Sequence, residues 1–109
     1  MDFWVAFVKI QQKRSDHETA DIEEFFVYPN PLNHGDNLMI DFKSELVNAF
    51  ILIEVRDVYG KVFYSQVYNT LEKHEHILQL DLNKSIASGS YFVSILTRQN
   101  YFNQKLIIR

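Results

Sequence analysis

Apolar and polar residues alternate along most of this chain, from about residue 25 to its end. In the segment 37–43, for example, Leu38, Ile40 and Phe42 fall on one face. A period of two is typical of a β-strand that buries one of its faces. The pattern therefore predicts about seven strands, at residues 25–28, 37–43, 49–57, 62–69, 75–82, 90–98 and 101–108.

The alternation also predicts which side chains face inward. In the segment 49–57, Ala49, Ile51, Ile53 and Val55 are expected on one face, and Glu54 and Arg56 on the other. In the segment 75–82, the inward positions are Leu78, Leu80 and Leu82. Both segments predict strands with one buried face.

Turn signals separate the predicted strands. Asp57 and Gly60 suit the first and fourth positions of a type I turn. Residues 99–100 predict a tight hairpin in which Asn100 is able to adopt the left-handed conformation. Many short strands at this spacing indicate an all-β antiparallel sandwich, and no helix of ordinary length is predicted after residue 25.

The beginning of the chain has a different character. Residues 13–24 are polar and charged, which predicts an N-terminal stub and linker at 1–24 and a sandwich domain at 25–109. Residues 1–10 are mostly apolar, but Asp2 and Lys9 do not fit a secretory signal peptide. The expectation is that Met1 is not the natural start or that the chain is the tail of a longer precursor.

Composition narrows the function. Of the 109 residues, 47% are hydrophobic, enough for a core, while a net charge of −3 with interspersed signs argues against nucleic acid as a partner. No apolar run approaches the roughly 20 residues that cross a bilayer, so direct membrane insertion is not expected. The absence of cysteine excludes disulfides and thiolate metal sites.

Candidate catalytic and metal residues are few. His74 and His76 share a predicted strand face, but no third ligand is near them, so no metal or cofactor is predicted. There is no nucleophile elbow, paired carboxylate signature or phosphate loop, and the chain is predicted not to be an enzyme. His17 and His34 lie in polar segments and are expected to be solvated. Three tyrosines are expected to be exposed: Tyr59, Tyr64 and Tyr68. Because exposed aromatic rings can bind sugars, a carbohydrate-binding module remains an alternative function.

Four short blocks stand between or within these strands. They are 27–31 (VYPNP), 57–61 (DVYGK), 87–92 (ASGSYF) and 105–109 (KLIIR). In this order and at these distances they resemble the type A C-terminal sorting domain of proteins exported by the type IX secretion system of Bacteroidetes. The resemblance covers about residues 25–109. It implies an immunoglobulin-like β-sandwich of about seven strands.

The resemblance implies a non-catalytic secretion signal that carries a cargo protein across the outer membrane to the cell surface or the medium. Its partners would be the type IX translocon and a sortase-like signal peptidase that cuts in the linker at 13–24. Translocon recognition is expected at Pro29, Pro31, Asp57, Gly60, Gly89, Tyr91, Phe92, Lys105, Leu106, Ile107, Ile108 and Arg109, with segment 101–109 carrying most of it. An adhesive immunoglobulin-like module remains a further alternative, and pairing of two chains through an exposed terminal edge strand stays open.

Overall fold

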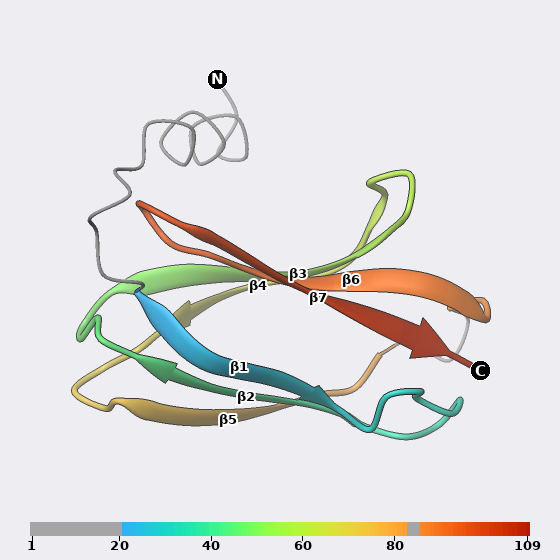
Figure 1. Cartoon of the computed structure of the whole chain (residues 1–109), viewed down its shortest axis with the longest axis horizontal. Coiled ribbons are helices and arrows are strands. Elements are labelled where there is room, and N and C mark those ends of the chain that lie inside the picture. The colour runs from blue at the N-terminus through green and yellow to red at the C-terminus, as the bar shows by residue number, and fades with distance from the viewer. Residues whose placement is uncertain (1–20, 83–85) are drawn as a thin grey trace.

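The structure is a computed structural model, and it describes residues 21–82 and 86–109. The described residues form strands joined by turns and loops (Figure 1). The strands are β1 (Ile22–Tyr28), β2 (Leu38–Ser44), β3 (Phe50–Asp57), β4 (Val62–Asn69), β5 (Glu75–Leu80), β6 (Gly89–Leu96) and β7 (Tyr101–Ile108). Each strand predicted from the alternation is confirmed, and β1 begins three residues earlier than predicted.

The strands form two antiparallel sheets that pack face to face, as predicted (Figure 1). One sheet has three strands in the order β1-β2-β5, and the other has four in the order β4-β3-β6-β7. The fourth strand therefore pairs with the third rather than with the fifth, which distinguishes this order from that of a constant immunoglobulin domain. The first and last strands, β1 and β7, are both edge strands of their sheets.

Alternate side chains of both sheets fill the space between them. Leu38, Ile40 and Phe42 of β2 have no exposed surface, as their spacing predicted. From the other sheet, the fully buried aliphatic side chains include Ile51, Ile53, Val55, Val93, Ile95 and Leu106. This core has the composition expected of two sheets that each bury one face.

Side chains on β3 and β4 are more buried than a simple alternation suggests, and the expectation that Tyr64 and Tyr68 are exposed was wrong. Glu54 does lie on the outward face of β3, but it is only 8% exposed, and this burial raises the pKa of its carboxyl while the nearby charge of Arg56 opposes the rise. Arg56 is half-buried and its Nη2 donates to the Tyr101 hydroxyl at 2.9 Å. Tyr64 and Tyr68 are half-buried and pack against the core, whereas Tyr59 is exposed as predicted.

The β6–β7 hairpin also differs from the expected turn. Asn100 is not among the described residues with positive φ; it is buried, and its Nδ2 donates to Asp21 Oδ2 at 2.6 Å. The Thr97 hydroxyl donates to the same carboxylate oxygen at 2.7 Å. The role of Asn100 therefore lies in its side chain, which connects the hairpin to Asp21, the residue just before β1.

Replacing Asp21 with alanine should destabilise the domain by about 1.5–3 kcal/mol, because two buried donors would lose a charged acceptor. Urea unfolding of the full chain measures this change. Asp21→Asn is the matched control: it keeps an oxygen of the same reach, so its loss should be clearly smaller. Equal stability of Asp21→Ala and the parent chain would contradict the role of this carboxylate.

Candidate functional site

The four sequence blocks meet at one end of the sandwich. The first lies at the end of β1 and the start of the β1–β2 loop, the second forms the β3–β4 hairpin, the third leads into β6, and the fourth closes β7 (Figure 1). Asp57 of the second block lies opposite Tyr91 of the third, and Tyr91 lies opposite Leu106 of the fourth. We call this region, formed by residues 27–32, 57–61, 87–92 and 105–109, the C-terminal end of the sandwich.

Asn30 joins the first block to the last. It stands between Pro29 and Pro31, and the peptide bonds before both prolines are cis. Its side chain donates from Nδ2 to the carbonyl of Lys105 at 2.8 Å and accepts at Oδ1 from the amide of Ile107 at 3.0 Å. One side chain thus satisfies two backbone groups on the outer edge of β7.

Leu32 continues this connection. Its amide donates to the carbonyl of Ile107 at 2.7 Å, and its carbonyl accepts from the amide of Arg109 at 2.8 Å, forming a short parallel bridge. β7 is an edge strand of its sheet, a point that the sequence left open, and its last residues are covered by the loop after β1. Backbone pairing of this kind holds the final strand in one position.

The second block is a self-supporting turn. The amide of Gly60 donates to the carbonyl of Asp57 at 3.1 Å, and Gly60 has a φ of 88°, which a side chain would strain. The Asp57 carboxylate accepts from the amides of Tyr59 and Lys61, both at 2.9 Å. The predicted turn is confirmed, and both of its signature residues act within the hairpin.

Tyr91 anchors the third block. It is 4% exposed, its hydroxyl donates to the carbonyl of Ala87 at 2.6 Å, and its ring meets that of Phe63 edge to face at 5.5 Å between centroids. Burial raises the pKa of the Tyr91 hydroxyl, and the charge of Asp57 adds to the rise. The tyrosine therefore stays neutral and holds the start of β6 in place.

The predicted recognition residues fall into three groups by exposure. Tyr91, Leu106 and Ile108 are buried, and Asp57, Phe92 and Ile107 are half-buried. The exposed members are Pro29, Pro31, Gly60, Gly89, Lys105 and Arg109. Sequence reasoning did not select Asn30 or Leu32, although both stand in or beside the first block, because their role depends on a strand far along the chain.

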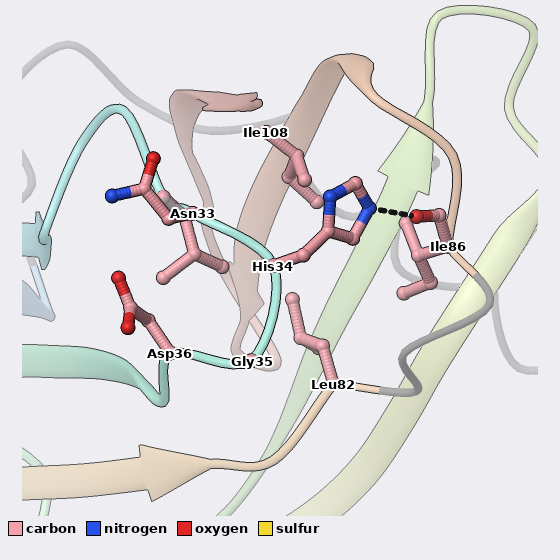
Figure 2. A pocket seen from close by; sticks show the side chains of 8 residues that line it. Asn33, His34, Gly35, Asp36, Leu82, Ile86 and Ile108 are labelled. Atoms are coloured by element: carbon pink, nitrogen blue, oxygen red, sulfur yellow. Dashed lines mark hydrogen bonds between the residues drawn. The ribbon is translucent and has the colours of Figure 1, made fainter.

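A small hollow lies beside this end, between the β1–β2 loop, the connection after β5 and the end of β7 (Figure 2). Its lining includes Leu32, Leu82, Ile86 and Ile108. His34 is exposed, as expected, and its Nε2 lies 2.7 Å from the carbonyl of Ile86, a contact that joins the β1–β2 loop to the connection after β5. His17 lies outside the described residues.

The two neighbouring histidines have separate surroundings. His76 is buried: its Nδ1 pairs with the Tyr68 hydroxyl at 2.9 Å and its Nε2 with the carbonyl of Lys73 at 3.1 Å. His74 is exposed and precedes β5, with Nδ1 3.1 Å from the carbonyl of Ser44. Within residues 21–82 and 86–109, no three His, Asp or Glu side chains are grouped to hold a metal ion.

A family model described as the secretion system C-terminal sorting domain matches residues 26–109. The chain belongs to this family. The match covers all four blocks and every residue that forms the C-terminal end of the sandwich. No curated protein matches the chain.

Membership of this family indicates the pathway, the destination of the cargo and the machinery involved. The sorting domain is the signal of type IX secretion, a pathway of Bacteroidetes, and it is not a catalytic family. It implies a cargo that is secreted or displayed on the cell surface and an interaction with the type IX machinery. Among the described residues, no helix is long and apolar enough to span a membrane.

Proposed function

We propose that this chain directs an attached cargo protein across the outer membrane, and that the type IX translocon reads the folded C-terminal end of the sandwich. The observation that supports this proposal is the meeting of the four family blocks there: strand pairing joins the last three, and Asn30 and Leu32 join the first to the last. A site that is already ordered binds a receptor without the entropy cost of ordering a flexible peptide.

The exposed block residues are then the direct contacts. Pro29, Pro31, Lys105 and Arg109 present side chains to solvent, and Tyr59 at the hairpin tip is 93% exposed. The buried block residues act indirectly, because they fix the backbone from which these side chains project. Lys61, Lys105 and Arg109 give this end several positive charges.

We further propose that the sortase-like peptidase cuts before Asp21. A protease needs extended backbone that is free of other pairing. Asp21 is buried against the β6–β7 hairpin, and β1 is paired with β2 from Ile22 onward. This narrows the cleavable part of the predicted linker from 13–24 to 13–20.

The test is a localisation assay. The full chain is fused behind a signal peptide and a fluorescent protein and expressed in a Bacteroidetes host with and without a working type IX translocon. Fluorescence should reach the surface or the medium in the first strain and stay in the periplasm of the second. A reporter with the signal peptide alone is the control and should stay in the periplasm of both strains.

Retention of the full fusion in both strains would refute the sorting function. Mass spectrometry of the exported reporter then tests the cleavage boundary. A new C-terminus within residues 13–20 supports the second proposal, whereas a cut inside β1 would contradict it.

A further inference from the structure

The outer face of the four-stranded sheet carries an apolar row that is not part of the sandwich core. Val67, Leu52, Leu96 and Tyr101 lie opposite one another on β4, β3, β6 and β7. Leu52 and Leu96 form a cluster separate from the core, and Tyr101 packs against it. We call these four residues the outer stripe.

The two leucines are shielded from solvent although they project away from the core. Leu96 has no exposed surface and Leu52 is 7% exposed. Among residues 21–82 and 86–109, no strand lies over this face of the sheet, since the other sheet covers the opposite one. Val67, the member of the stripe on β4, is 58% exposed, so the row still offers apolar surface to another part of the chain or to a partner.

Asp21, the first residue that the structure describes, lies beside this stripe. The Asp21 carboxylate accepts from Thr97, which follows Leu96 directly, and from Asn100, which directly precedes Tyr101. Residue 21 is thus held at the end of β6 and the start of β7, where two members of the stripe lie. A segment that precedes it in the chain starts close to the apolar row.

We propose that residues 3–10 dock on the outer stripe. Every residue of this segment is apolar except Lys9, and three of them are the aromatic residues Phe3, Trp4 and Phe7. The ten residues between it and Asp21 span up to about 33 Å when extended, and a four-stranded sheet is crossed in about 14 Å. The segment can therefore reach every position along the row.

A tethered segment also has an advantage over a second copy of the chain. A tether of ten residues gives it an effective concentration on the order of millimolar, which exceeds the concentration of free chains in most samples. Docking within one chain buries the apolar residues of both surfaces at once. This inference does not depend on the sorting function, so either can fail without the other.

The first experiment uses a spin label on the full chain. The chain has no cysteine, so Ala6→Cys provides a unique site for a nitroxide. In an NMR spectrum of the ¹⁵N-labelled chain, the amide signals of Leu52 and Leu96 should lose most of their intensity. The signals of Phe26 and Ile77, on the outward side of the other sheet, should keep more of theirs. Absence of this difference would overturn the proposal.

A mixed sample separates docking within one chain from docking between chains. Spin-labelled chain without ¹⁵N is combined with ¹⁵N-labelled chain that carries no spin label. The stripe signals of the ¹⁵N chain should be unchanged. A loss as large as in the first sample would assign the stripe to a second copy and overturn the proposal.

Trp4 offers an independent measurement, because it is the single tryptophan of the chain. Leu52→Lys should raise the acrylamide quenching constant of Trp4 several-fold and shift its emission to longer wavelength. Ile77→Lys, at a position 61% exposed on the other sheet, is the control and should change neither. If Leu52→Lys does not fold, Val67→Lys, at a position 58% exposed, serves as the stripe variant and should have the same effect on Trp4. Equal quenching in the parent chain and the folded stripe variant would overturn the proposal.

Discussion

A fusion that lacks residues 106–109 should not leave the periplasm, and its sorting domain should not fold. Leu106 has no exposed surface and Ile108 is 4% exposed, so the deletion removes two aliphatic side chains from the core. Losses of about 2–5 kcal/mol for each are typical, against a total stability of about 5–15 kcal/mol. It also removes the bridge to Leu32. Circular dichroism and reporter localisation measure the two effects.

A matched variant separates recognition from folding. Lys105→Ala and Arg109→Ala together remove two exposed side chains and leave the buried residues of β7 in place. This double variant should keep the stability of the parent chain, within about 0.5 kcal/mol, as exposed substitutions usually do. A loss of export in this folded variant would identify direct contacts. Normal export of the chain without residues 106–109 would contradict the assignment of the signal to this end.

The sequence was sufficient to predict the strands, because a period of two is a local property. The alternation around Leu38, Ile40 and Phe42 identified β2 and its buried face, and the turn at Asp57 and Gly60 ended β3 correctly. A side chain's face follows from its own strand alone. The order of strands within each sheet does not, and the sequence left it open.

The errors arose where a side chain's surroundings come from distant residues. The alternation placed Glu54 on the correct face of β3, but it gave no sign that this side chain, which lies between Ser94 and Ser65 on the neighbouring strands, is buried there. Asn100 was assigned a backbone role from its position in a hairpin. Its buried amide instead meets Asp21, a residue far away in the chain, which no local pattern could indicate.

The candidate site shows the same division. The blocks were recognised from their residues, but the sequence did not show that they meet. The connection between the first and last blocks depends on Asn30, whose side chain makes hydrogen bonds to two backbone groups on the edge of β7. An asparagine between two prolines predicts a turn, and its partners become known only when the first and last strands are placed.

Phe42→Ala should destabilise the domain more than Asp21→Ala does, with a loss of about 3–5 kcal/mol. The ring of Phe42 has no exposed surface, stacks on His76 at 5.0 Å and meets Tyr68 edge to face at 6.4 Å. Urea unfolding of the full chain measures the change. Phe26→Ala, at a position 57% exposed on β1, removes the same side chain from the surface and should have a far smaller effect.

The same pair of variants tests whether the signal is read in its folded form. Phe42 lies outside the four blocks and near the end of β2 that leads away from them, so its replacement leaves every block residue in the sequence. If the translocon reads the folded end of the sandwich, export should fall with the folded fraction of Phe42→Ala and stay normal in Phe26→Ala. Full export of an unfolded Phe42→Ala chain would mean that the blocks are read as an extended peptide, and the connection made by Asn30 would then serve stability alone.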